Sequence, residues 1–116
     1  MYFHDDNAWI EDKGFWARGG AALALTVGVR TDRQPTGVPL QVHSGGAPTA
    51  VRMATPAWST TVDATPDTFA AVFVPARAGQ LLLPLTITPA KGYVPAEHEA
   101  ASADRRHLGC WVEVTP

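Results

Sequence analysis

The chain has 116 residues, of which 46 % are apolar and 17 % charged, and its formal net charge is −2. Nine Lys and Arg residues against eleven Asp and Glu leave no basic excess, which argues against a nucleic-acid partner. The longest apolar run, residues 81–85, contains Pro84 and is far shorter than the roughly 18 residues that cross a membrane, so we expect no membrane insertion. The single cysteine, Cys110, excludes an internal disulfide and a thiolate zinc cluster.

The start of the chain (MYFHDDN) is acidic and polar. It lacks the basic residues and the apolar stretch of a signal peptide. This leaves a cytoplasmic protein, a mature form or a domain of a larger protein. We favour the last, because Tyr2 and Phe3 are typical of the middle of a strand. The compartment then depends on the parent protein.

Alternation of apolar with polar or small residues predicts strands along most of the chain. In chain order these cover residues 23–29, 38–43, 51–53, 58–62, 68–74, 81–87 and 110–114. Residues 51–53 form a short segment typical of a sheet edge. Residues 68–74 are apolar on both faces, which predicts a central strand covered on both sides.

Turn signals rich in Gly, Pro and Asp separate these segments. Strands at roughly 10–14-residue spacing without intervening helices indicate antiparallel pairing in two packed sheets. Residues 96–106 have a helical composition but no apolar stripe, and we expect a loop there with at most one short turn. The predicted fold is all-β, one antiparallel β-sandwich domain over residues 1–116 with about seven to nine strands. Because the paired cysteines of an immunoglobulin domain are missing, a jelly-roll-like topology is the better expectation.

Motifs for enzymatic chemistry are absent from the sequence, which has no G-x-S-x-G elbow, P-loop or dinucleotide fingerprint. Cys110 lies on the apolar face of the last strand, which predicts a buried and unreactive thiol. One functional alternative is a small hydrolase or isomerase. Glu97 and Glu99 would serve it as a catalytic pair only if extended backbone placed both carboxylates on one face. We expect no catalytic activity and no cofactor.

Metal binding has little support in the sequence. His4, Asp5 and Asp6 offer ligands near the N-terminus, yet the D-x-[DN]-x-[DN]-G pattern of a calcium loop is missing. The other histidines, at positions 43, 98 and 107, do not share a ligand spacing. No metal site is predicted.

The four tryptophans are the most informative aromatic residues. We expect Trp16 and Trp58 in the core, because aromatic side chains dominate the cores of small domains. Trp111 alternates with the apolar residues of the last strand and so lies on its opposite face. An exposed tryptophan can stack on the apolar C–H face of a sugar ring, so Trp111, together with Trp9, is a candidate ligand-binding residue.

Charged residues near the two ends of the chain predict a contact between them. Asp104 and Arg106 are two residues apart, so in extended backbone their side chains point the same way and can share a partner. Glu11 is the candidate partner. We expect a Glu11–Arg106 pair that closes the first and last segments on each other, either as a structural clamp or as the lining of a ligand pocket.

Two motifs bracket the chain. Residues 11–20 (EDKGFWARGG) are similar to an E-x-x-G-F-W-x-x-G opening, and residues 92–109 (GYVPAEHEAASADRRHLG) to an F-x-P-x-E … D-x-R-x-L-G ending. Tyr93-Val94 stands where an aromatic-led F-x-P is common. In these motifs and their order the chain resembles a β-sandwich domain of bacterial surface-polysaccharide and membrane glycosyltransferase-like proteins, usually a C-terminal appendage. The middle of the chain matches only in its rhythm of strands and turns.

The resemblance implies a non-catalytic accessory unit with the architecture of a carbohydrate-binding module, extracytoplasmic within its parent protein, and a glycan or polysaccharide as ligand. The matched residues Glu11, Trp16, Asp104, Arg106 and Gly109 would be structural, with Gly109 present for its backbone conformation, or the charges would line a sugar pocket. The alternative function is a structural or protein–protein interaction module that contacts other subunits or domains. Two exposed aromatic residues on one surface would favour carbohydrate binding, and a wide apolar patch would favour the interaction module.

Overall fold

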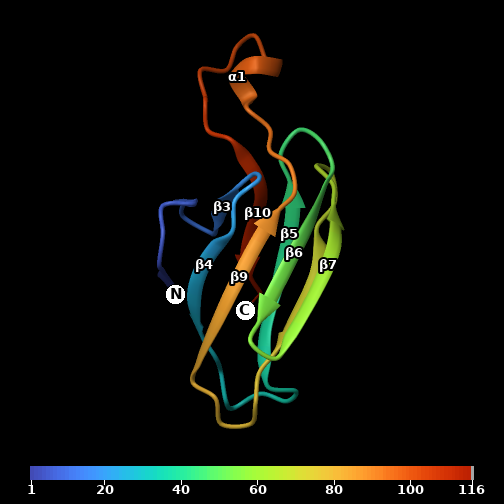
Figure 1. Ribbon diagram of the computed structural model, residues 1–116. Helices are drawn as coiled ribbons and strands as arrows, with labels where there is room; N and C mark the ends of the chain where they lie inside the picture. Colours follow the sequence, from blue (N-terminus) through green and yellow to red (C-terminus); the bar gives the residue numbers. More distant parts are fainter. Residues whose placement is uncertain (116) are drawn as a thin grey trace.

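Two antiparallel sheets of five strands pack face to face in the computed structural model, which describes residues 1–115 (Figure 1). The front sheet, which faces the viewer in Figure 1, has the order β1-β4-β9-β6-β7, and the back sheet has the order β2-β3-β10-β5-β8. The elements are β1 (Tyr2–Phe3), β2 (Ala8–Ile10), β3 (Phe15–Arg18), β4 (Leu23–Gly28), β5 (Gly37–Ser44), β6 (Thr49–Thr55), β7 (Trp58–Ala64), β8 (Ala70–Pro75), β9 (Leu82–Pro89), α1 (Pro95–His98) and β10 (Leu108–Val114).

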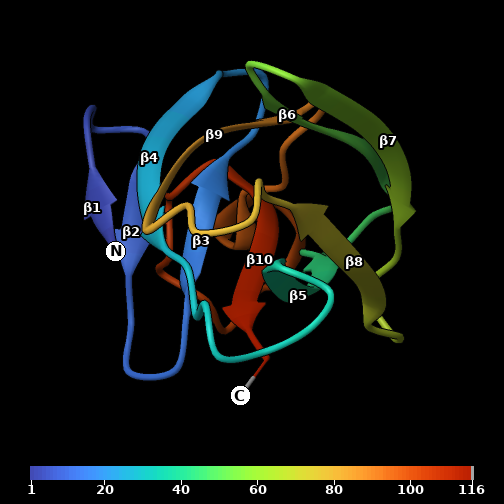
Figure 2. The same cartoon turned by 90° about the horizontal axis from the view of Figure 1, so that it is seen from below.

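The strand pairs are nested within one another. β3 pairs with β10, β4 with β9, β5 with β8 and β6 with β7, all antiparallel. This is one long hairpin with its tip at the β6–β7 turn, and its successive pairs alternate between the two sheets (Figure 2). Such a wrapped hairpin is a jelly roll, so the predicted all-β, antiparallel, jelly-roll-like sandwich is confirmed. The strands number ten instead of seven to nine because β1, β2 and β3 are too short to show a clear alternation.

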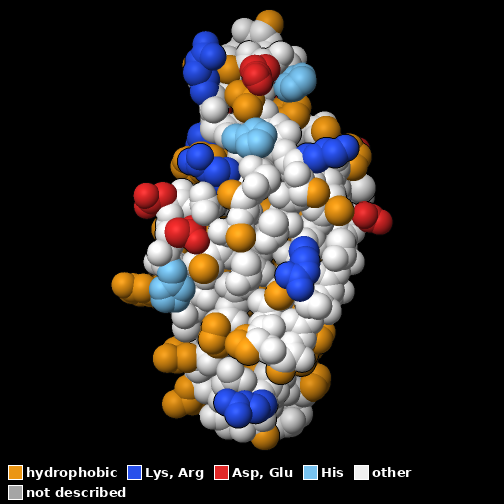
Figure 3. Space-filling model, viewed as in Figure 1, with side chains coloured by type: hydrophobic (Ala, Val, Ile, Leu, Met, Phe, Trp, Pro, Cys, Tyr) orange, Lys and Arg blue, Asp and Glu red, His pale blue; other side chains and the backbone are white. Residues whose placement is uncertain are grey.

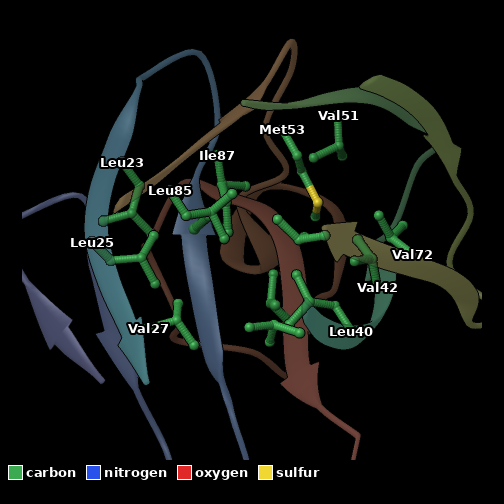
Figure 4. Packing of buried hydrophobic residues seen from close by; sticks show 14 of the residues in the cluster. Leu23, Leu25, Val27, Leu40, Val42, Val51, Met53, Val72, Leu85 and Ile87 are labelled. Carbon is green, nitrogen blue, oxygen red and sulfur yellow. The ribbon is translucent and has the colours of Figure 1, made fainter. Parts of the chain in front are cut away.

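One cluster of buried apolar side chains fills the space between the sheets. In β4, Leu23, Leu25 and Val27 are at most 3 % exposed, while Ala24 and Thr26 between them face outward. Figure 4 shows side chains from β4, β9, β6, β5 and β8 pointing toward one another in the same way. Burial of one such side chain contributes about 1.5–3 kcal/mol. The core therefore determines which face of each strand is left for other interactions.

Two strand positions differ from the sequence prediction. Residues 68–74 fall largely on β8, which is an edge strand of the back sheet and not a central one. The pattern was misleading because the outward residues Phe69 and Phe73 are apolar, yet 45 % and 40 % exposed. Residues 51–53 lie within β6, an inner strand between β9 and β7, and not at an edge. This segment looked short because alanine and threonine flank its two buried residues.

Residues 96–106 form a loop that contains one short helical turn near its start, as predicted, and it projects beyond the sheets at the top of Figure 1. Tyr93 anchors its base through backbone hydrogen bonds of 2.7 and 2.8 Å with Leu108. The Tyr93 ring lies over Gly46, where an added Cβ atom would clash with it. Among the described residues, no helix is long and apolar enough to cross a membrane.

Candidate functional site

Aromatic side chains cross the outer face of the back sheet from one edge to the other. Trp9 of β2 lies opposite Trp16 of β3, and Trp16 lies opposite Trp111 of β10. Trp111 in turn lies opposite His43 of β5, whose ring contacts Phe69 just before β8. Directly opposed residues of antiparallel strands share one face of the sheet. These five side chains therefore line up on one surface, which we call the aromatic row.

Three ring pairs within the row pack edge to face, and His43 and Trp111 stack with their centroids 6.4 Å apart. The centroid distances are 5.4 Å for Trp16–Trp111, 5.6 Å for Trp16–His43 and 4.9 Å for His43–Phe69. Aromatic pairs with this geometry contribute about 0.5–1.5 kcal/mol beyond their buried area. The tryptophans of the row are half-buried and Phe69 is 45 % exposed. The row is thus an ordered surface that still presents aromatic carbon to solvent.

The position of Trp16 corrects the prediction that it lies in the core. Phe15 and Ala17 take the inward positions of β3, at 2 % and 0 % exposed, and so Trp16 points outward. Apolar and outward residues do alternate in β3, but the strand has four residues, so the pattern is too short to predict the orientation of Trp16. Trp58, the other tryptophan expected in the core, is half-buried and packs against it.

The indole of Trp111 is held in place from two directions. Its Nε1–H donates to Glu113 Oε2 at 2.7 Å. Its ring lies beside Gly14, where an added Cβ atom would come within 2.9 Å of Cζ2 and would clash with the Val112 carbonyl. Gly14 is the glycine of the E-x-x-G-F-W segment, so this segment makes room for the indole. As predicted, Trp111 lies on the face opposite the buried Cys110.

The outer face of the front sheet is chemically different (Figure 3). Its outward positions carry mainly small residues and threonines, among them Ala24, Thr26, Arg52, Ala54, Ser59, Thr61, Asp63, Pro84, Thr86 and Thr88. In Figure 3, hydrophobic side chains are scattered over this face and protrude mainly along its lower left margin. Within residues 1–115, the aromatic rings that this sheet turns outward are Tyr2 of edge strand β1 and His4 just after it, whose ring centroids are 5.1 Å apart. The aromatic surface therefore belongs to the back sheet.

Charged side chains adjoin the Trp9 end of the row. Arg106 donates from Nε and Nη2 to Asp104 at 2.7–3.1 Å, and from Nη1 to Glu11 Oε2 at 3.0 Å. The predicted contact between the two ends of the chain therefore forms, and we call Glu11, Asp104 and Arg106 the charged clamp. Hydrogen bonds from the Arg106 side chain lower the pKa of the Asp104 carboxyl, and the bond to Asp104 is the main cause of a raised pKa of Arg106.

Trp9 connects the charged clamp to the aromatic row. Its ring lies against two guanidinium groups, with Cζ of Arg18 at 5.1 Å and Cζ of Arg106 at 6.0 Å from the ring centroid. Both are cation–π contacts. Arg18 follows Trp16 by two residues on β3 and shares its outer face. Trp9 thus contacts two arginines, while the far end of the row at Phe69 is 45 % exposed.

All of the predicted site residues come together on this face: Trp9, Glu11, Asp104, Arg106 and Trp111. The structure adds further residues to the surface: Trp16, Arg18, His43 and Phe69. The sequence held only one signal for them, the alternation within β3 and β5. Their common surface arises from strand register, which pairs residues that are far apart in the chain.

Gly109 is required for space and not for backbone conformation, which corrects its expected role. The glycines with positive φ are Gly20 and Gly79. At Gly109 an added Cβ atom would come within 2.5 Å of Pro89 and 2.8 Å of the Ala17 carbonyl. The register between β10 and β3 shifts at this point. The glycine therefore lets the start of β10 lie close against its neighbours.

Other groups considered for chemistry lie away from this surface or are inaccessible. Cys110 is 0 % exposed, and burial raises the pKa of its thiol to about 12. Glu97 lies in α1, while Glu99 follows it and accepts a hydrogen bond from the Tyr93 hydroxyl, so the two do not form an extended pair. Across residues 1–115, no group of three or more His, Cys, Asp or Glu side chains is placed to hold a metal ion.

None of the protein-family models, curated proteins or solved structures compared with the chain matches it. The resemblance of the two bracketing motifs to a domain of surface-polysaccharide proteins therefore stays a prediction. The candidate site is defined by the geometry of the back sheet alone.

Proposed function

We propose that the protein is a non-catalytic, carbohydrate-binding accessory domain that binds its ligand on the outer face of the back sheet. The observation that carries this proposal is the aromatic row, which runs from β2 across β3, β10 and β5 to Phe69 just before β8, while the front sheet presents mainly small residues. Strands lie about 4.8 Å apart, so a row across five of them extends for about 20 Å. That length accommodates several sugar units of a glycan chain.

The chemistry of the surface supports sugar binding. Aromatic rings stack on the apolar C–H faces of pyranose rings, and half-buried tryptophans in a fixed orientation lose little conformational entropy on binding. Hydrogen-bonding groups lie beside the row: Glu113 is on the same face as Trp111, and Gln41 is directly opposite Glu113. These groups can bond to sugar hydroxyls.

The charged clamp supports binding without catalysis. A glycosidase needs a carboxylic acid with a raised pKa as its proton donor. Hydrogen bonds from Arg106 instead lower the pKa of Asp104, so this carboxyl is held ionised. Glu11 is likewise paired with Arg106. The carboxylates of the clamp are thus suited to ordering an arginine.

A glycan array with matched variants tests the proposal. Trp111→Ala removes a ring from the middle of the row, and Tyr2→Ala removes an exposed ring from the other sheet as the control. We expect the wild type and Tyr2→Ala to bind the same glycans and Trp111→Ala to bind them at least about tenfold more weakly. Thermal unfolding of both variants checks that the fold is retained. No glycan binding by the wild type, or equal loss in both variants, would contradict the proposal.

A second candidate function, a protein–protein interaction module, is favoured by apolar side chains along the edge formed by β1 and β2. Met1, Tyr2, Ile10, Leu82 and Val114 are 42–70 % exposed. Met1 borders two surface hollows, one shared with Leu82 and the other with Ile10 and Val114. Contiguous exposed apolar residues mark interaction surfaces.

Sedimentation velocity over a range of protein concentrations tests this second function for self-association. The double variant Ile10→Ser, Leu82→Ser removes apolar surface from both hollows. Concentration-dependent assembly of the wild type that the double variant lacks would favour the interaction module. A monomer at every concentration would count against an assembly of identical chains.

A further inference from the structure

We propose that the glycan bound by the back sheet is acidic, and that Arg18 binds its carboxylate or sulfate group at the Trp9 end of the row. This inference rests on the proposed function and specifies the class of its ligand. It follows from a difference between the two arginines that lie against Trp9: among the described residues, Arg106 is paired with carboxylates and Arg18 is not.

Arg106 has its charge compensated within the protein. Its guanidinium donates to both oxygens of Asp104 and to Glu11, in bonds of 2.7–3.1 Å. A guanidinium bound in this bidentate way has its donor edge occupied. Arg106 therefore orders the surface and has little capacity left for a ligand anion.

The charge of Arg18 is not compensated within the described part of the protein. Its side chain is exposed, and within residues 1–115 it forms no ion pair with a carboxylate. Its Cζ atom lies over the Trp9 ring, 5.1 Å from the ring centroid. A cation–π contact occupies few of the five N–H donors of a guanidinium, so donors remain available for a ligand. Arg18 is thus an ordered cation without a counterion on the ligand-binding face.

The position of Arg18 suits a ligand that also contacts the row. It lies two residues beyond Trp16 on the same face of β3, a separation of about 7 Å along the strand. A glycan stacked on the row can therefore place an acidic group on Arg18 without leaving the surface. Carboxylates and sulfates both accept two parallel hydrogen bonds from a guanidinium, and neutral sugars offer no such charged acceptor.

The experiment compares Arg18→Gln with Arg52→Gln. Both variants lose one positive charge, but Arg52 is exposed on the outer face of the front sheet and so provides the matched control. An array of neutral, uronic-acid and sulfated glycans is followed by titration of one acidic oligosaccharide that binds. When that ligand carries uronic acid, its carboxyl-reduced form is titrated as the neutral control. Comparison of the uronic-acid and sulfated glycans on the array shows whether the protein prefers a carboxylate or a sulfate.

We expect the wild type and Arg52→Gln to prefer acidic glycans, and Arg18→Gln to bind them at least about tenfold more weakly, close to the level of the neutral forms. Preference for neutral glycans, or equal affinity of the two variants, overturns this inference while the carbohydrate-binding function stands. If the wild type binds no glycan at all, the proposed function fails and this inference fails with it.

Discussion

The guanidinium of Arg106 binds the carboxylate of Glu11, 95 positions away in the chain, with 3.0 Å between Nη1 and Oε2. The bond joins the turn that follows β2 to the segment that leads into β10. Arg106 also binds Asp104 within that same segment, while its bond to Glu11 ties the segment to the edge of the back sheet. The side chains of the charged clamp are 28–43 % exposed, so solvent weakens their interaction and the clamp adds a modest amount to stability.

Replacing Arg106 with Met should destabilise the fold. The substitution leaves Asp104 and Glu11 without their partner, and we expect a loss of about 1 kcal/mol, or about 5 °C in the thermal midpoint. Thermal unfolding followed by circular dichroism measures it. Arg105→Met, a change at the exposed neighbouring residue, is the control. A midpoint equal to that of the control would show that Arg106 is merely solvated.

The fall in the free energy of unfolding at acidic pH should depend on Asp104. Its pKa is lower in the folded protein than in the unfolded chain, chiefly through hydrogen bonds from Arg106. The stabilisation is therefore present above about pH 4 and is lost as the pH falls through the folded pKa. We expect Asp104→Asn to show a shallower decline in unfolding free energy between pH 5 and pH 2 than wild type. Asp12→Asn, an exposed residue without an arginine partner among the described ion pairs, should keep the wild-type slope.

Removing the Ser44 hydroxyl should stabilise the protein. Ser44 is 1 % exposed and its Oγ has no hydrogen-bond partner among residues 1–115. Ser44→Ala relieves the cost of an unpaired buried hydroxyl, and we expect a gain of about 1 kcal/mol in denaturant unfolding. Thr49→Val should have the opposite sign, because Thr49 Oγ1 accepts a hydrogen bond of 2.9 Å from the Lys91 backbone N–H. A loss of stability in Ser44→Ala would refute this account.

The thiol of Cys110 should be unreactive in the folded protein. It is fully buried, and burial raises its pKa to about 12, so hardly any thiolate forms near neutral pH. We expect no reaction with Ellman's reagent at pH 8 and full reaction of one thiol after unfolding in guanidinium chloride. Rapid reaction under native conditions would show that the end of the sandwich opens.

Gly14→Ala should displace the indole of Trp111. An added Cβ atom would clash with the Val112 carbonyl and approach the indole to 2.9 Å. We expect a changed near-ultraviolet circular dichroism spectrum, lower stability and weaker glycan binding. Gly28→Ala is the matched control, because an added Cβ atom there has nothing within 4 Å. Identical spectra for the two variants would mean that Gly14 is not needed for the indole position.

Much of the fold was readable from the sequence. The alternation of Leu23, Leu25 and Val27 predicted β4 and its buried face, and the same pattern predicted most of β9 and β10. Period-two burial is a local property, so it needs no knowledge of the partner strands. The Glu11–Arg106 contact was also predicted, because opposite charges stood at the two ends of a closed sandwich.

Other features could not be predicted, for identifiable reasons. The outward aromatic residues of β3 and β8 imitated core residues, since composition alone does not separate an exposed ring from a buried one. Arg18 carried no sign of its contact with Trp9, because that contact depends on a residue from a different strand.

The sequence by itself determined the inward faces of the longer alternating strands β4, β9 and β10, and hence the sandwich and its core. Only the tertiary structure decided that Trp9, Trp111 and His43 share one surface with the charged clamp at its end. The physical reason is register: side-chain direction along a strand is set by neighbours in sequence, whereas the pairing of β2, β3, β10 and β5 is set by the packing of the whole core.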